Sequence, residues 1–249
     1  MWRWYHELRP DELAECVKVT PIALWPLGLI EHHGWHLPVG YDGIKAERIC
    51  IRVAENTGGV ILPTMWWGAN GGHGDFSWTH YQPEEASGAI LASTTGQLLR
   101  FGFRVIVLLG GHYPWQGILE KHIPAIQKKH PDRLILWGTE ASIGGEALGI
   151  RGDHAAREET SFGLYLLSEL VDMKTLRPGR GASASWPGGQ APPVEGRHPG
   201  VRFDPNDPLF AQMGEDARTA SAKRGEEAIS RLVGHLTETI DRYLGKSAG

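Results

Sequence analysis

Short apolar runs alternate with helix-like segments through the first two thirds of the chain. The runs are apolar at successive positions, which is typical of strands that are buried on both faces of a parallel sheet. We expect strands at 21–30, 59–66, 104–109 and 134–137, and helices at 42–55, 89–101 and 114–128. Strands that alternate with helices predict an α/β fold with three layers, α/β/α, around a mostly parallel sheet. We expect residues 1–249 to form one domain.

The last third of the chain has a different pattern. Residues 177–208 are rich in Gly and Pro and carry little apolar surface, so we expect a long ordered loop there. Apolar residues then recur at spacings of three and four, which predicts an amphipathic helix that packs one stripe onto the body of the protein. The residues of this stripe are Ile229, Leu232, Val233, Leu236, Ile240, Tyr243 and Leu244.

Composition narrows the classes of protein that the chain can belong to. The 25 Lys and Arg residues against 29 Asp and Glu give a net charge of −4, which is no electrostatic signature for nucleic acid or anionic lipid. No run approaches the roughly 18 apolar residues that span a bilayer. Two cysteines, Cys16 and Cys50, and an N-terminal segment without a signal-peptide pattern favour a reducing compartment. We therefore expect a cytoplasmic protein without nucleic-acid or membrane partners.

Polar side chains with catalytic or metal-binding chemistry follow three of the predicted strands. In parallel sheets, ligands bind beyond the carboxyl ends of the strands, so these side chains should converge. Helix caps and hydrogen-bonded buried histidines would explain any one of them alone, but not the set at three strand ends. The set consists of Glu31, His33 and Asp42 after the first strand, His112 after the third, and His154 and Glu159 after the last.

Four of these residues form a candidate metal site. Glu31 and His33 are two residues apart, and in an extended segment their side chains point the same way. Asp42 arrives at the start of the next helix, where its carboxylate could bridge two cations. His112 adds an imidazole from a neighbouring strand. Carboxylates and imidazoles without thiolates suit Zn, Mn or Fe in a catalytic role.

The same segments resemble the motifs of a known family. The run from Glu31 to Asp42, Glu-His-His-Gly-Trp-His-Leu-Pro-Val-Gly-Tyr-Asp, resembles the signature of the creatininase family. Gly111-His112 and the run 154–161, His-Ala-Ala-Arg-Glu-Glu-Thr-Ser, resemble two further motifs of that family, in the same order. The resemblance implies a creatininase-like fold, two divalent metal ions per chain, and hydrolysis of a C–N bond in a cyclic amide. It also implies a homo-oligomer, commonly a hexamer.

Residue roles follow from the resemblance, position by position. It implies that Glu31, Asp42 and His112 hold one metal ion, that His33 and Asp42 hold the other, and that Asp42 bridges them. His154 would transfer protons, and Glu159 would lie close to the metals. In creatininases a Glu two residues after the motif His ligates the second metal, but Pro114 stands there in this chain. Glu159 could replace it, and creatinine is not the expected substrate. Further departures from the family pattern are His32, Gly110, Trp115 and Ala156.

The chain has 10 Trp residues, several of them in the segment 65–80. Together with neighbouring aromatic residues they could form one wall of a pocket for a flat small-molecule substrate, or they could fill an oligomer interface. The candidate substrate-binding residues are Trp35, Trp67, His73, Trp78, Tyr113 and Trp115.

These observations predict a metal-dependent amidohydrolase in which His154 shuttles protons. Two alternatives use the same site on a formamide, or as a C–C hydrolase on a cyclic diketone derived from a sugar or inositol. A third alternative is a ligand-binding protein of the same fold without catalysis. No phosphate-binding glycine motif follows a predicted strand, so a nucleotide cofactor is not expected.

Overall fold

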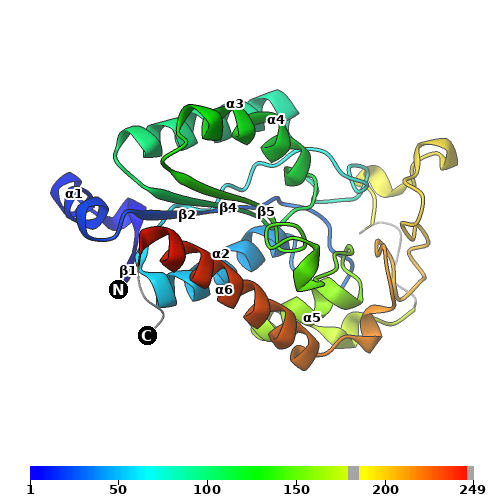
Figure 1. Cartoon of the computed structure of the whole chain (residues 1–249). Helices are drawn as coiled ribbons and strands as arrows, with labels where there is room; N and C mark the ends of the chain where they lie inside the picture. Colours follow the sequence, from blue (N-terminus) through cyan, green and yellow to red (C-terminus); the bar gives the residue numbers. More distant parts are fainter. Residues whose placement is uncertain (179–184, 246–249) are drawn as a thin grey trace.

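The computed structural model describes residues 1–178 and 185–245. Its centre is a five-stranded sheet with the strand order β1-β3-β2-β4-β5, in which every neighbouring pair is parallel (Figure 1). The prediction of a parallel α/β sheet is therefore confirmed. The strands are β1 (Trp2–Trp4), β2 (Ile22–Leu27), β3 (Gly59–Ile61), β4 (Val105–Gly110) and β5 (Leu134–Thr139).

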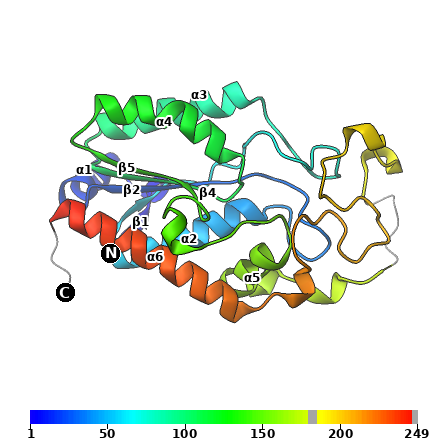
Figure 2. The same ribbon diagram turned by 45° about the vertical axis from the view of Figure 1, so that its right-hand side comes forward.

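Helices cover both faces of the sheet and complete the predicted three layers. α3 and α4 lie over one face, and α2, α5 and α6 lie over the other (Figures 1 and 2). Short α1 packs beside the N-terminal edge of the sheet. The helices are α1 (Pro10–Val19), α2 (Tyr41–Thr57), α3 (Glu84–Arg100), α4 (Trp115–Lys129), α5 (Arg157–Leu166) and α6 (Ala222–Leu244).

The continuous apolar pattern of β4 reflects its burial on both faces. Val105 and Val107 face the core that contains α2, α5 and α6, whereas Ile106 and Leu108 face the core that contains α1, α3 and α4. All four side chains are fully buried. A strand in this position has no solvent-facing side, so it needs no alternation of polar and apolar residues.

The predicted C-terminal amphipathic helix is confirmed as α6. Its buried stripe includes Ile229, Leu232 and Leu236, and it packs mainly against α5 and α2. The side chain of Ser221 accepts a hydrogen bond from the backbone N–H of Arg224 and caps the helix start. The helix lies below the sheet in Figure 1, and its apolar stripe joins the hydrophobic core on that side of the sheet.

Several expected boundaries are wrong, and three elements were not expected. The strand predicted at 59–66 ends at Ile61, two residues before Pro63, which has no N–H to donate. The helix expected at 42–55 begins one residue earlier and ends two residues later, as α2 (Tyr41–Thr57). β1, α1 and α5 are short and were not predicted. α1 did carry a start signal, since Pro10 is its first residue and the Glu12 carboxylate accepts the backbone N–H of Arg9.

The Gly- and Pro-rich segment extends beyond the body of the fold (yellow to orange in Figure 1). Its described part, residues 177–178 and 185–208, contains short 3₁₀ turns at Pro187–Gly189 and Val194–Gly196, and the other residues of the expected loop lie outside the described part. Trp186 and Phe203 from this segment pack against Phe76 and Phe210. A small aromatic cluster thus holds the segment against the loops at one end of the sheet.

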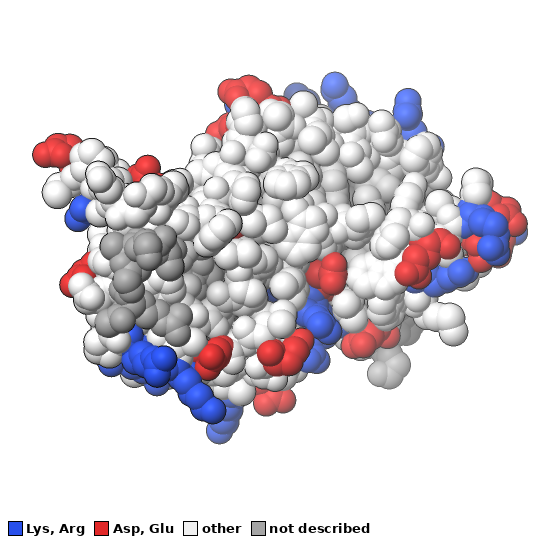
Figure 3. Space-filling model, turned by 180° about the vertical axis from the view of Figure 1, so that it is seen from behind, with Lys and Arg blue, Asp and Glu red and all other residues white. Residues whose placement is uncertain are grey.

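The surface shown in Figure 3 carries scattered charged side chains of both signs, separated by broad uncharged areas. Among the described residues, no helix combines the length and the apolar character that crossing a membrane requires.

Candidate metal centre

A cluster of buried carboxylates and imidazoles lies beyond the carboxyl ends of β2 and β4. Its members come from four segments that are far apart in the sequence, and each is almost completely buried. They are Glu31 and His33 after β2, Asp42 in the first turn of α2, His112 after β4, and His154 and Glu159 at the start of α5.

One half of the cluster joins Glu31, Asp42 and His112. The Nδ1 atom of His112 lies 3.1 Å from Glu31 Oε2 and 3.3 Å from Asp42 Oδ2. One ligand atom from each of these residues lies within 4.8 Å of the others. Gly111 permits this approach, because a Cβ atom there would overlap the carbonyl oxygen of Asp42. This is the set that the resemblance assigned to the first metal ion.

The other half of the cluster joins His33 to Glu159. The Nε2 atom of His33 lies 3.0 Å from Asp42 Oδ1 and 3.7 Å from Glu159 Oε2. His154 completes a second group of three potential ligands with His33 and Glu159. Asp42 therefore turns one oxygen toward His33 and the other toward His112, which is the geometry of a bridging carboxylate.

Four imidazoles around the cluster are held in the same way. Each has one ring nitrogen within hydrogen-bond distance of a backbone carbonyl oxygen, which can only accept, so that nitrogen carries the hydrogen. The opposite nitrogen faces the carboxylates, where it can carry a proton or offer its lone pair to a cation. This is the usual arrangement of histidines that ligate metals. The contacts are His33 Nδ1 to Glu31 O at 3.0 Å, His112 Nε2 to Asn70 O at 2.8 Å, His154 Nε2 to His32 O at 2.9 Å, and His73 Nε2 to Ala211 O at 2.7 Å.

Backbone strain accompanies this arrangement. Asn70, Ala155 and Ala211 have positive φ angles of 63°, 49° and 65°, which non-glycine residues rarely adopt. Each contacts the cluster through its backbone: the Asn70 and Ala211 carbonyls hold imidazoles, and the Ala155 N–H donates to Glu159 Oε2 at 2.8 Å. Strain that is concentrated in this way is typical of functional sites.

The electrostatics of the cluster fit a divalent cation. Glu31 Oε2, His33 Nε2 and Asp42 Oδ2 are buried and have no hydrogen-bond partner. Burial alone would lower the pKa of His33, but Asp42 and other carboxylates raise this pKa to about 9. Burial would raise the pKa of Asp42, but His33 and His112 hold it well below its usual range. Buried carboxylate oxygens and imidazole nitrogens that face a common point suit Zn, Mn or Fe in place of the protons.

Two residues that contact the cluster, Tyr81 and Lys45, escaped the sequence analysis. Tyr81 donates a hydrogen bond of 2.5 Å to Glu31 Oε1. Lys45 Nζ lies 2.6 Å from both Glu140 Oε1 and Glu159 Oε1. Lys45 did leave a signal, because it stands three residues after Asp42, on the same face of α2, and interrupts the apolar pattern of that helix.

A cavity of about 370 Å³ opens onto the cluster. Its inner lining includes Glu31, His73, His112 and His154, and its outer walls include Tyr113, Pro114, His198 and Met213. Pro114, at the position where the resemblance would place a glutamate ligand, thus contributes an apolar wall.

The tryptophans predicted to contact substrate do not line this cavity. Trp115 is completely buried, and its Nε1–H donates to the carbonyl oxygen of Gly28. Trp35 stacks on the ring of Phe210, with ring centroids 5.1 Å apart. Trp67 and Trp78 are 51% and 68% exposed. Of the six predicted substrate-binding residues, His73 and Tyr113 are the two in the cavity lining.

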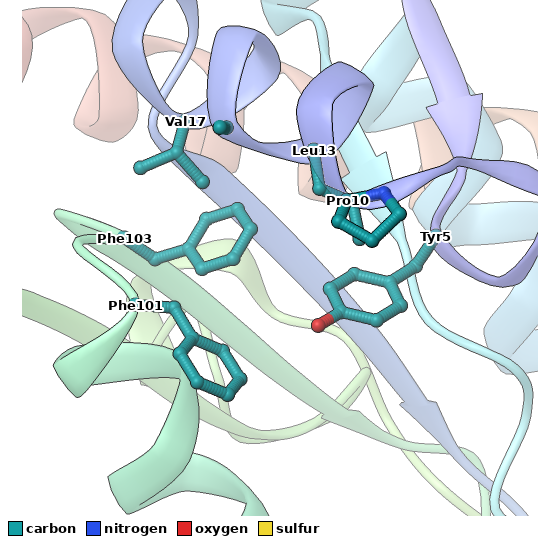
Figure 4. A pocket seen from close by; sticks show the side chains of 7 residues that line it. Tyr5, Pro10, Leu13, Val17, Phe101 and Phe103 are labelled. Carbon is teal, nitrogen blue, oxygen red and sulfur yellow. The ribbon is translucent and has the colours of Figure 1, made fainter.

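A second cavity, of about 320 Å³, has a different character. It lies between α1 and the segment that leads from α3 to β4 (Figure 4). Figure 4 shows Tyr5, Pro10 and Leu13 facing Phe101 and Phe103 across the gap. Its lining offers neither imidazoles nor carboxylates, so it lacks the groups that bind a divalent cation.

The chain thus falls in the class of three-layer α/β proteins with buried carboxylates and imidazoles at the strand ends, arranged as a candidate centre for two divalent metal ions. The sequence profile of the creatininase family, described as creatinine amidohydrolase, matches residues 6–240. The chain belongs to the creatininase family.

The relatives of this chain differ in what they act on. It is similar to the creatinine amidohydrolase of Pseudomonas putida, with 24% identity over 88% of both chains. It is 28% identical to the mycofactocin precursor peptide peptidase of Mycobacterium ulcerans (strain Agy99), over 71% of this chain and 70% of the relative. It is 27% identical to the 3-dehydro-scyllo-inosose hydrolase of Thermotoga maritima, over 44% of this chain and 35% of the relative.

Solved structures share the fold. A crystal structure of creatinine amidohydrolase superposes with a TM-score of 0.72, covers 96% of both chains and is 23% identical in sequence. The creatininase-like fold that the resemblance implied is thereby confirmed.

Proposed function

We propose that this protein is a metal-dependent hydrolase that cleaves a C–N bond in a small cyclic amide. The observation that carries the proposal is the meeting of Glu31, His33, Asp42 and His112 in a buried site, where one nitrogen of each imidazole faces the carboxylate oxygens. Membership of the creatininase family supports the reaction class.

The residues present fit two divalent cations. Glu31, Asp42 and His112 would hold the first, and His33, Asp42 and Glu159 would hold the second. When bound, such cations lower the pKa of water and polarise a scissile carbonyl group. Because Pro114 offers no side-chain ligand, Glu159 takes the place of the glutamate that follows the motif histidine in creatininases.

His154 is the proton-transfer residue of the proposed mechanism. Its Nε2–H is held by the carbonyl oxygen of His32, so Nδ1 is the atom that exchanges protons. Burial and the neighbouring charge on His33 lower the pKa of His154 well below its usual value, so the ring is neutral near pH 7. His154 Nδ1 takes a proton from the attacking water and delivers it to the leaving nitrogen. Such general acid–base catalysis contributes roughly 10²- to 10⁴-fold.

The size of the cavity supports a small substrate. A volume of about 370 Å³ lies at the lower end of the range for ligand sites. Tyr113 and His198 offer polar groups at its walls, and Pro114 and Met213 offer apolar contact. A compact ring with an amide bond matches this combination.

A second candidate keeps the site and changes the bond. Similarity to the 3-dehydro-scyllo-inosose hydrolase favours a cyclic diketone derived from a sugar or inositol as substrate. The carbonyl group would occupy the same position, and carbon would replace nitrogen as the leaving atom. Formamides are a further substrate class within the leading proposal.

Turnover with and without cations tests the proposal. Wild-type protein would be stripped of metal, reloaded with Zn, Mn or Fe, and assayed on lactams, hydantoins, formamides and inosose-type ketones. We expect hydrolysis of an amide that depends on added cations and is lost in Glu31→Gln. Full activity in the metal-free protein contradicts the proposal, and binding without turnover under every loading favours a non-catalytic ligand-binding protein.

Metal content separates the two roles open to His154. If His154 transfers protons, His154→Ala keeps two cations and slows turnover by roughly 10²- to 10⁴-fold. If His154 is instead a ligand beside His33 and Glu159, the same change releases a cation. Glu159→Gln provides the comparison that should release one. His6→Ala, at an exposed position far from the cluster in sequence, is the control that should change neither quantity.

A further inference from the structure

Lys45 is a completely buried lysine beside the candidate metal centre. It lies in the first turns of α2, and its Nζ atom donates to Glu140 Oε1 and to Glu159 Oε1, both at 2.6 Å. The rings of Tyr41 and Tyr113 also contact the ammonium group, and the centroid of each ring lies 5.1 Å from Nζ. The ammonium group is therefore enclosed by two carboxylates and two aromatic rings.

Packing alone does not explain a lysine at this position. Burying an ammonium group costs several kcal/mol, and a pair of ionic groups often stabilises a fold no better than apolar side chains of similar volume. Elsewhere on α2, Ala46 and Ile49 fill buried positions with apolar groups. The contacts of Lys45 must therefore serve another purpose.

Those contacts fix the orientation of Glu159. One of its carboxylate oxygens, Oε1, accepts from Lys45, and the other, Oε2, accepts from the backbone N–H of Ala155 at 2.8 Å. With both oxygens held, the carboxylate cannot rotate. Oε2 then stays 3.7 Å from His33 Nε2, on the side of the second cation position.

Glu140 completes the arrangement from the end of β5. Its Oε1 atom accepts from Lys45 and also from the hydroxyl of Tyr113 at 2.8 Å. Tyr113 directly follows His112, so the network ties β5, α2 and the loop after β4 to α5. The negative charge of Glu140 balances the positive charge of Lys45. The pair can therefore orient Glu159 without changing the net charge of the site.

We propose that Lys45, backed by Glu140, is a positioning residue that holds Glu159 as a ligand of the second cation. The inference rests on the proposed function in one respect, the binding of two cations. It also explains how Glu159 can act as a metal ligand in this chain, where Pro114 stands at the position of the glutamate ligand of creatininases.

The test removes the pair together, in the double variant Lys45→Met/Glu140→Gln. Both changes keep the side-chain volume nearly constant and together remove one positive and one negative charge. We expect the first cation to bind as in the wild type and the affinity for the second to fall by roughly 10- to 100-fold, the usual effect of removing a group that orients a metal ligand. Titration calorimetry with Zn²⁺ and elemental analysis after dialysis measure both, and the absorption spectrum of Co²⁺-loaded protein reports the change at the second position.

Matched variants define the outcome. Glu159→Gln should weaken the same cation, whereas Arg48→Met/Glu169→Gln, which removes an exposed ion pair at the same helix, should weaken neither. A second cation bound with wild-type affinity by the Lys45→Met/Glu140→Gln variant overturns the inference, and so does a wild-type protein that binds fewer than two cations. If the double variant does not fold, Tyr113→Phe removes one hydrogen bond from Glu140, and unchanged affinity there overturns it as well.

The failure of the proposed function gives a different result. Wild-type protein that binds two cations, loses the second in the double variant and hydrolyses none of the test substrates contradicts the proposed function and supports the role of Lys45.

Discussion

The body of the sheet and its carboxyl-terminal edge are both buried, yet they are built on opposite principles. In the body, side chains such as Leu24 and Val107 are apolar and lie in continuous hydrophobic clusters. At the edge, Glu31, His33 and Asp42 are equally buried but present atoms without hydrogen-bond partners. Burial therefore contributes to stability in one region and prepares chemistry in the other.

The two regions differ in whether the protein chain alone satisfies their buried groups. In the body it does, because the buried apolar side chains pack against one another. At the edge, the buried carboxylates need protons or cations to neutralise them. The pKa of His33 therefore rises to about 9 beside Asp42, because a protonated imidazole supplies the positive charge. Substitutions in the two regions should therefore give different signatures, which the following experiments measure.

The largest effect is expected for Asp42→Asn at the edge. Losing the carboxylate that faces both His33 and His112 should lower turnover on the cleaved substrate by roughly a thousandfold or more, since cation chemistry supplies several kcal/mol. Cations at about 100 times their Kd should stabilise the wild type by about 2.7 kcal/mol and the variant by much less. Thermal unfolding with and without Zn²⁺ measures this, and an undiminished cation effect would place the bridging role elsewhere.

A change in the body should do the reverse. Leu232 is fully buried in the stripe of α6, so Leu232→Ala should lower the free energy of unfolding by roughly 2–5 kcal/mol. Cation stoichiometry should stay the same. Arg231→Ala, the exposed neighbour on the same helix, should change stability by less than about 0.5 kcal/mol. Urea unfolding gives both values, and a loss of cations in Leu232→Ala would show that the two regions are coupled.

Acid should act on a buried imidazole behind the edge. Burial lowers the pKa of His36 to about 3, while its Nε2 atom bonds with the Thr160 hydroxyl. Because the folded-state pKa lies below the unfolded value near 6.5, its stabilising contribution is complete above pH 6.5 and is lost as pH falls toward 3. By pH 5 the loss should be about 2 kcal/mol. Urea unfolding at pH 7 and pH 5 should show a smaller pH effect in His36→Gln, and an equal effect would contradict the assignment.

The smallest effect concerns strain at the edge. Trp78 is exposed and has a φ angle of 71°, a conformation that glycine adopts without cost. Trp78→Gly should therefore raise the free energy of unfolding, by at most about 1 kcal/mol, because relief of strain exceeds the lost backbone entropy. Trp67→Gly, at an exposed tryptophan whose φ is not positive, should lower it. Thermal unfolding of both variants measures the difference, and destabilisation by Trp78→Gly would show that its ring is held by contacts.

The sequence predicted the body of the fold well because periodic burial leaves a periodic pattern. Continuous apolar runs marked β2, β4 and β5, and the spacing of Leu232 and its neighbours marked α6. Short elements gave weaker signals. β1 has three residues and α5 has its buried face occupied partly by Glu159, Thr160 and Ser161, so neither shows an apolar pattern.

The edge was predictable to the extent that position along a strand determines which side chains meet. Glu31, His33, Asp42 and His112 were found in this way and through the family motifs. Contacts that depend on three-dimensional partners escaped, as with Lys45. The tryptophans expected in the substrate wall, such as Trp115, lie elsewhere because composition does not tell which side of a loop an aromatic ring will take.

The anchoring of the imidazoles by main-chain carbonyl groups has a consequence for how this protein can evolve. The oxygens of Asn70 and Ala211 that hold His112 and His73 belong to the backbone. The tautomers of these two histidines therefore depend on the backbone conformation of two loops and not on the side chains in them. Side chains along those loops are thereby free to diverge and to reshape the entrance for new substrates while the inner chemistry is preserved.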